Sequence, residues 1–290
     1  MQPALAGVSS EPVDLEVGAG LRRRWMRSPT FLGGLAVLLT LVALALLAPL
    51  ITPYDPIRQD LNNVLAGPSS HHWLGTDQLG RDVWTRLLYG GRIDLQVGFL
   101  AVFFPFCLGT FLGSLAGYYG RWIDLIVMRL VDVVVAFPFY VLVIALVFVL
   151  GAGVRSIYIA ITIVGWVSYA RIIRGEILVA KRQEYVLAAR SAGFSDLRII
   201  ARHILPNVIT QAIVFAMSDI VLSILAIVAL GYLGLGVPPP TPDWGNMIFD
   251  GQTFMTTRWE ISTIPGLAVV ATGLGLSLFG DGLSDLLAPE

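Results

Sequence analysis

Long runs of apolar residues dominate the pattern along this chain. Five of them, at 31–51, 97–118, 125–150, 208–237 and 261–279, are long enough to cross a membrane, because a spanning helix needs about 20 mostly apolar residues. A shorter run at 157–170 reaches that length if Arg155 and Arg171 extend toward the two interfaces. The runs are continuous rather than alternating, which favours helices over barrel strands. We therefore predict an all-α integral membrane protein with six transmembrane helices.

Two prolines fall inside these runs. Pro105 lies in the second and Pro138 in the third. Proline lacks the backbone N–H and clashes with the preceding turn, so we expect a kink at each position.

The composition supports the same class. Of the 290 residues 56% are hydrophobic and 13% are charged, about half the charged share of a soluble domain. The single cysteine, Cys107, excludes a disulfide within the chain and a cysteine-rich metal site. His71 and His72 have no further ligands nearby, so no metal site is predicted.

The basic residues predict the orientation. With the N-terminus in the cytoplasm, the cytoplasmic segments carry thirteen of the 19 Lys and Arg residues, and the other side carries six, as the positive-inside rule requires. The run at 31–51 is longer than a signal sequence core, so we interpret it as a retained anchor. The expected division is a cytoplasmic tail 1–30, a first helix 31–51, an extracytoplasmic loop 52–96, a core 97–281 with five transmembrane helices, and a cytoplasmic tail 282–290.

One cytoplasmic loop, 181–206, is long, basic and helical in pattern. Its first part is rich in strong helix formers and ends near Gly193, which suits a C-terminal cap. A second amphipathic helix is expected after Ser195, and Pro206 either stops it or opens the next span. From the pattern alone, docking on a partner protein and lying on anionic lipid are equally good interpretations.

The stretch EYVLAARSAGFSDLRIIARHILPN within this loop resembles the signature loop of ATP-binding-cassette (ABC) importer permeases. Leu187 and His203 depart from the general pattern, which has Glu and Ile there. Both departures resemble the dipeptide and oligopeptide branch of the family, and they leave no residue for the role of the signature glutamate. Residues 75–92, 233–248 and 274–289 resemble the same branch. The positions that match the signature are Ala188, Ala189, Gly193, Leu205 and Pro206.

The resemblance implies a type I ABC importer permease fold with both termini cytoplasmic. It implies that Tyr185, Ala188, Ala189, Ser191, Gly193, Leu205 and Pro206 couple the chain to an ATPase. The expected partners are a homologous second permease (a heterodimer), two cytoplasmic ABC ATPases and an extracytoplasmic peptide-binding protein, in the bilayer of a prokaryotic plasma membrane and without nucleic acid. The chain has no phosphate-binding loop motif. We therefore expect no enzymatic activity and no cofactor in this chain, with ATP and Mg held by the ATPases.

Some charged residues are candidates for the transport path. Asp219 lies deep in the fifth run, where a charge is costly. It either faces a peptide path, or is a buried acid that is hydrogen-bonded to neighbouring helices or simply protonated. Arg129 and Asp132 are expected to pair with each other. Five residues in the extracytoplasmic loops are candidates for a gate or a contact with the binding protein: Asp77, Arg81, Asp82, Asp243 and Trp244. The alternative is a solvated turn for the first three and the cap of a short re-entrant element for the last two.

Other functions stay open at this level. A secondary transporter usually shows inverted repeats, and the sequence shows none. Nickel and oligosaccharide importers have related permeases, so another cargo is possible within the family. A scaffold or sensor subunit is the third alternative, and the intact signature loop argues against it.

Overall fold

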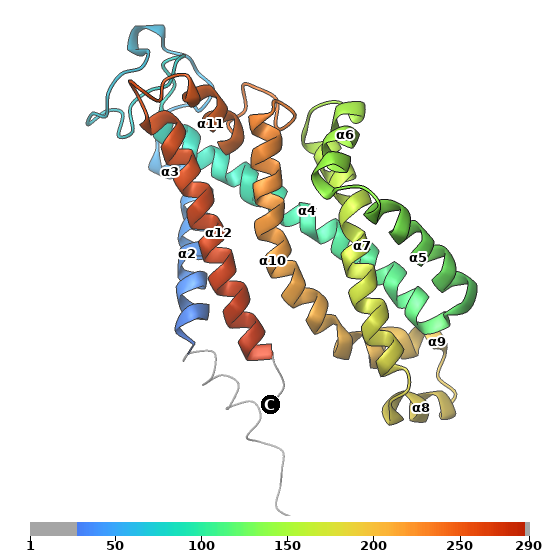
Figure 1. Cartoon of the computed structure of the whole chain (residues 1–290). Coiled ribbons are helices and arrows are strands. Elements are labelled where there is room, and N and C mark those ends of the chain that lie inside the picture. The colour runs from blue at the N-terminus through green and yellow to red at the C-terminus, as the bar shows by residue number, and fades with distance from the viewer. Residues whose placement is uncertain (1–27, 288–290) are drawn as a thin grey trace, which may run out of the picture.

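The computed structural model describes residues 28–287, and these form a helical protein with a single isolated β-bridge between Thr76 and Asp82 (Figure 1). The predicted tail 1–30, with its four arginines, lies almost entirely outside the described residues. The elements in chain order are α2 (Pro29–Leu46), α3 (Ala48–Ile51), η1 (Leu61–Asn63), α4 (Val83–Tyr119), α5 (Arg121–Val135), α6 (Phe139–Leu150), α7 (Val154–Ala180), α8 (Glu184–Ser191), α9 (Asp196–Arg198), η2 (Ile199–Ile204), α10 (Leu205–Tyr232), α11 (Trp244–Gln252) and α12 (Glu260–Leu287).

The described residues contain six candidate membrane spans when one bent helix pair is counted as a single span. The predicted number of six is therefore confirmed. The bent span consists of α5 and α6, which meet at 89°. Pro138 lies directly before α6, so the predicted kink at Pro138 is a complete break. At Pro105, in contrast, α4 continues as one helix.

Helix α4 is 37 residues long and runs diagonally across the molecule (Figure 1). Asp82 caps its N-terminus by accepting the Thr85 N–H at 2.7 Å. Gly120 ends it with a positive φ of 66°, which glycine adopts without strain. The helix thus begins at Val83, inside the segment 52–96 that hydropathy assigned to a loop. Arg86 and Asp94 in its first turns are buried in contacts within the protein, whereas Arg92 is exposed.

The most extensive helix pair, α4 with α7, depends on glycines spaced four residues apart. A Cβ atom at Gly109 would lie 2.3 Å from the Trp166 carbonyl oxygen, and one at Gly113 would lie 2.6 Å from the Ala170 carbonyl oxygen. Gly117 continues the series against α7. Small residues at this spacing allow the helix backbones to approach closely, which is how helices associate when lipid surrounds them.

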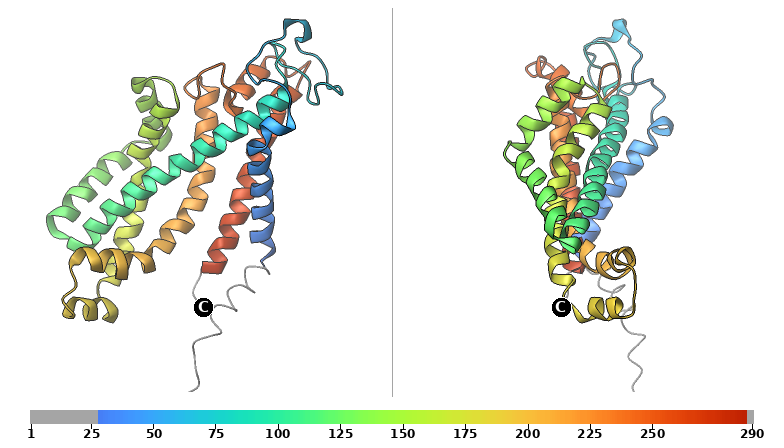
Figure 2. Two further views of the ribbon diagram at one scale, coloured as in Figure 1. Left: turned by 180° about the vertical axis from the view of Figure 1, so that it is seen from behind. Right: turned by 90° about the vertical axis from the view of Figure 1, so that its right-hand side faces the viewer.

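The two ends of the molecule differ in construction (Figure 2). One end carries the long loop 52–82 and α11, and the other carries α8 and α9. Helices α2 and α12 pack side by side, and α10 lies between them and α7 (Figure 1). Both α4 and α10 reach from one end of the molecule to the other (Figure 1).

Candidate functional site

Helix α8 lies at the end of the molecule opposite the long loop and has two distinct faces. Val186 and Ala189 are buried against the core. Tyr185 is 41% exposed and Leu187 is 48% exposed. Among the residues assigned to coupling by resemblance, Ala188 and Ser191 are also exposed. The helix therefore has a packed underside and an accessible, partly apolar outer face.

The turn after α8 has the geometry that the sequence predicted. Gly193 has a φ of +78°, and its N–H donates to the Arg190 carbonyl oxygen at 3.0 Å. The Phe194 N–H donates to the Ala189 carbonyl oxygen at 3.3 Å. These contacts satisfy carbonyl groups at the end of α8, as a glycine cap does. Nothing lies within 4 Å of a Cβ at Gly193, so this turn is open to its surroundings.

The second helix of the loop does not end at Pro206. It begins as α9 and continues through the π-helical segment η2 into α10 without a break. Pro206 lies in the first turn of α10, with Leu205 beside it. The wide π-helical turns before it accommodate a residue that has no N–H to donate. Of the two predicted roles for Pro206, the one that opens the next span is correct.

Helix α8 is held to the end of α4 by polar contacts. The Tyr118 hydroxyl donates to the Asp196 carboxylate at 2.7 Å. Arg190 donates to the Tyr118 oxygen at 3.3 Å, and its guanidinium carbon lies 5.6 Å from the centre of the Tyr118 ring. On the other side of the loop, Lys181 Nζ donates to the Gly117 carbonyl oxygen at 2.7 Å. We call these contacts the α4–α8 clasp.

Sequence reasoning missed the clasp. Tyr118 and Asp196 are 78 residues apart, and no local pattern relates them. The one signal in the sequence is a polar aromatic residue shortly before Gly120, at the end of an apolar run.

At the opposite end of the molecule, the five candidate gate residues are all buried. Asp77, Arg81 and Asp82 are each 4% exposed, Trp244 is 3% exposed and Asp243 is 0% exposed. The solvated turn considered for the first three is therefore wrong, and these side chains are not available for surface contact with a binding protein in this structure. A role in a gate remains a proposal.

Ion pairs hold this region together. Arg81 Nε lies 2.7 Å from Asp77 Oδ2, and Arg86 Nε lies 3.4 Å from the same oxygen. Arg81 Nη2 is 3.7 Å from Asp250 Oδ2 on α11. The two arginines and two aspartates balance in charge, which is how buried ions are tolerated.

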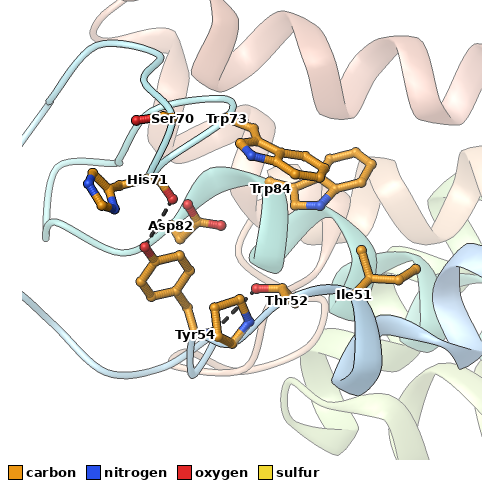
Figure 3. A pocket seen from close by; sticks show the side chains of 9 residues that line it. Ile51, Thr52, Tyr54, Ser70, His71, Trp73, Asp82 and Trp84 are labelled. Atoms are coloured by element: carbon orange, nitrogen blue, oxygen red, sulfur yellow. Dashed lines mark hydrogen bonds between the residues drawn. The ribbon is translucent and has the colours of Figure 1, made fainter.

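A cavity of about 240 Å³ opens beside Asp82 where the long loop meets the start of α4 (Figure 3). Asp82 Oδ2 lies 2.8 Å from His72 Nδ1. The Tyr54 hydroxyl donates to the His71 carbonyl oxygen at 2.9 Å. The rings of Trp73 and Trp84 lie 5.9 Å apart on one wall of the cavity. Among the described residues, no group of three or more His, Cys, Asp or Glu is placed to hold a metal ion.

Trp244 anchors α11 on α4. Its Nε1–H donates to the Leu87 carbonyl oxygen at 3.0 Å, and its backbone N–H donates to Asp94 Oδ2 at 2.8 Å. A Cβ atom at Gly91 would lie 2.8 Å from the indole ring, so glycine is required for this close approach. Asp94 was not singled out from the sequence, although it is a charged residue at the edge of an apolar run.

Asp219 on α10 is partly buried and accepts a hydrogen bond from the Tyr169 hydroxyl at 2.7 Å. This contact matches the buried, hydrogen-bonded interpretation, and it leaves the second carboxylate oxygen for another partner.

The predicted pair of Arg129 with Asp132 is wrong. Asp132 instead lies 3.9 Å from Arg171 Nη2 on α7, and both side chains are about half exposed. A bonded pair between α5 and α7 is formed by Arg174 and Asp124, with Nη2 2.7 Å from Oδ2. Tertiary contact with α7, rather than spacing along α5, decides these partners.

Two family models match the chain. Residues 109–290 match the binding-protein-dependent transport system inner membrane component, and residues 19–68 match the N-terminal transmembrane domain of oligopeptide transport permease C. The first match covers more than half of the chain.

Curated relatives match almost the full length. The dipeptide transport system permease protein DppC of Alkalihalophilus pseudofirmus is 41% identical over 257 residues, which cover 89% of this chain and 84% of the relative. The glutathione transport system permease protein GsiD of Pectobacterium atrosepticum is 40% identical over 269 residues, which cover 92% and 89%.

One solved structure, the inward-facing MetNI methionine ABC transporter, has a similar fold. The TM-score is 0.53 at 16% sequence identity, over 70% of this chain and 97% of that one. At this identity the similarity concerns the fold alone, which is that of type I ABC importer permeases.

Proposed function

This chain belongs to the binding-protein-dependent transport system inner membrane components, and on that premise we propose that it lines a peptide translocation path and is driven by an ATPase that docks on α8. As an ABC importer permease of the dipeptide and oligopeptide family, it is a multi-pass protein of the bacterial plasma membrane and is not itself an enzyme.

The observation that supports the coupling proposal is that α8 is attached to the rest of the protein at both of its ends. A helix that merely rested on lipid would not need a rigid attachment at both of its ends. Helix α8 is attached through Lys181 before it and through Arg190 and Asp196 at and beyond its end. A rigid helix with an exposed face transmits displacement, since the attached elements must move with it.

The proposed assembly contains two permeases and two ATPases, with an extracytoplasmic binding protein that delivers the cargo. ATP and Mg are held by the ATPases. The chain's own contribution is the α8 face, the clasp and the helices that line the path. Residues proposed for the docking face are Tyr185, Ala188, Ser191 and Gly193, with Ala189 packed beneath it and with Leu205 and Pro206 joining this face to α10.

For the cargo we propose di- or oligopeptides. The support is that relatives similar over most of the chain are named for dipeptide and glutathione transport. Asp219 is the residue proposed to meet the peptide amine, since it keeps a carboxylate oxygen free of the Tyr169 bond.

The coupling proposal is tested by placing a charge on the α8 face. Leu187→Arg changes an exposed position that is 48% accessible. It avoids Gly193, where any side chain also strains the turn. Leu61→Arg is the matched control, because Leu61 is an exposed leucine in the loop at the far end of the molecule, 71% accessible.

The chain is purified with its partners from native membranes in mild detergent, and each co-purifying subunit is quantified. We expect Leu187→Arg to lose the ATPase and keep the second permease, while Leu61→Arg keeps both. If an ATPase is retained equally by both variants, α8 is not its docking face. If wild-type protein co-purifies with no ATPase at all, a secondary transporter or a scaffold becomes the better explanation.

The cargo is tested separately with the wild-type complex in proteoliposomes and its binding protein. Uptake of a labelled dipeptide and of glutathione is compared with uptake of Ni²⁺ and of a labelled oligosaccharide. ATP-dependent uptake of Ni²⁺ or of the oligosaccharide alone would overturn the peptide assignment and leave the coupling proposal untouched.

A further inference from the structure

Two carboxyl groups, those of Asp94 and Asp243, meet inside the protein at the end opposite α8. Both residues are 0% exposed. Asp94 lies on α4, and Asp243 is the N-cap of α11, where it accepts the N–H groups of Gly245 at 3.3 Å and Asn246 at 3.1 Å. The two residues are neighbours in space. The N–H of Trp244, which follows Asp243, donates to Asp94 Oδ2 at 2.8 Å. A Cβ at Gly90, one turn before Asp94, would lie 3.5 Å from Asp243 Cα. Two acids are thus placed together at the junction of α4 and α11.

The oxygens of Asp94 are not equivalent. Oδ2 accepts the Trp244 N–H at 2.8 Å. Oδ1 is fully buried, and among the described residues no N–H or hydroxyl group donates to it. The group that Asp94 faces is the Asp243 carboxyl, which donates a hydrogen bond only when protonated. An orphaned acceptor at such depth is costly, whereas one proton between the two carboxyls would satisfy it.

No nearby cation is free to neutralise two negative charges here. Arg86 is the cation that acts on Asp243, and it is engaged with Asp77, which also binds Arg81. Asp250 balances the second arginine. Helix α10 contributes no charge at this place. Its Gly231 approaches Asp243 so closely that a Cβ would lie 2.6 Å from Oδ2.

These surroundings favour an acid that keeps its proton. Burial raises the pKa of Asp243 above its ordinary value, against the smaller opposing effect of its hydrogen bonds and of Arg86. Two like charges in contact raise the proton affinity of the pair further, and the pair then titrates as a unit.

We propose that Asp94 and Asp243 form a proton-binding site: the pair shares one proton, and the resulting O–H···O bond fastens α11 to α4. Loss of the proton places two buried carboxylates against each other and releases the N-terminus of α11 from α4 and α10. The proposal concerns the chain alone and does not depend on the cargo or on the ATPase.

The test is thermal unfolding of the purified full-length chain in detergent, from mildly acidic to alkaline pH. Near neutral pH the folded pair binds a proton that the unfolded chain has released. Stability therefore falls as pH rises, up to the point at which the folded pair also loses its proton. Asp94→Asn removes this dependence while keeping the bonds, since the amide oxygen accepts from Trp244 and the amide N–H₂ donates to Asp243.

We expect the Tm of the wild type to fall with rising pH and that of Asp94→Asn to change much less. Asp132→Asn, at a carboxylate that is 62% exposed, is the matched control and should keep the wild-type slope. Equal slopes in wild type and Asp94→Asn would overturn the proposal.

If Asp94→Asn folds poorly, the reciprocal variant Asp243→Asn is used for the same measurement. Its amide N–H₂ donates to Asp94, and its one oxygen accepts one of the two α11 N–H groups, which bind separate oxygens of Asp243 in the wild type. At Asp94 an amide reproduces the shape and hydrogen bonds of a protonated carboxyl, so at least that variant should fold at neutral pH. If neither folds, the site requires two charged carboxylates and the shared proton is excluded.

Discussion

The Tyr118 hydroxyl at the end of α4 donates to the carboxylate of Asp196 at 2.7 Å. Asp196 lies directly after the turn that follows α8. At the other end of the same helix, Asp94 accepts the backbone N–H of Trp244 at the start of α11. One continuous helix therefore joins the proposed ATPase-docking face to the α11 end. We propose that a displacement of α8 reaches α11 along α4 through the clasp, beside the second route through η2 and α10.

Tyr118→Phe should weaken coupling without unfolding the chain. It removes the hydroxyl that binds both Asp196 and Arg190 and keeps the ring over which Arg190 lies. Loss of a hydrogen bond to a charged group costs about 1.5–3 kcal/mol, so we expect transport per ATP hydrolysed to fall roughly tenfold. Reconstituted complex is assayed for uptake and ATP hydrolysis together.

The adjacent Tyr119 supplies the control for this prediction. It is 44% exposed, and Tyr119→Phe should leave the ratio of transport to hydrolysis unchanged. A Tyr118→Phe complex with the wild-type ratio would show that the clasp plays no part in coupling.

Gly113→Ala should destabilise the chain by about 1–3 kcal/mol, the usual cost of overpacking. The added Cβ would lie 2.6 Å from the Ala170 carbonyl oxygen and 2.9 Å from its Cα, and backbone atoms cannot move aside as a side chain can. Gly175→Ala on α7 is the control, because nothing lies within 4 Å of its Cβ. Thermal unfolding in detergent measures both, and similar Tm values would contradict the close α4–α7 contact.

Asp219→Asn should reduce uptake of peptides with a free amino terminus and spare N-acetylated peptides. The amide keeps an acceptor for the Tyr169 hydroxyl, so the contact between α7 and α10 survives while the negative charge is removed. Tyr169→Phe makes the opposite change, removing the bond and keeping the charge. Uptake that falls equally for both kinds of peptide would assign Asp219 a structural role.

Arg258→Lys should loosen the long loop 52–82. Arg258 Nη2 donates to the Ala66 carbonyl oxygen at 2.7 Å, its Nη1 donates to Leu65, and its Nε donates to Glu260 at 2.7 Å. Lysine keeps the charge but cannot supply this planar set of donors. Limited proteolysis should cleave the loop faster in this variant, whereas Arg155→Lys, at an exposed position, should behave as wild type.

Hydropathy alone determined the number of spans and the helical class. In a bilayer each segment must satisfy its own backbone groups and present apolar side chains to lipid. Whether a segment spans the membrane therefore depends on the residues of that segment alone. The turn at Gly193 was predictable for the same reason, since a positive φ is a local requirement that glycine meets. The signature loop, together with the stretches 75–92, 233–248 and 274–289, likewise indicated the family from contiguous residues.

Other features depend on partners far away in the sequence. Hydropathy could not show that α4 begins at Val83, because Arg86 and Asp94 in its first turns are buried against the long loop and α11. The partner of Asp132 proved to be Arg171 on another helix. Burial of Asp77 and Arg81, the clasp at Tyr118 and the meeting of Asp94 with Asp243 all need two or more segments packed together. Tertiary structure decides these contacts, because the energy of a charge or a polar group depends on what surrounds it and not on its neighbours along the chain.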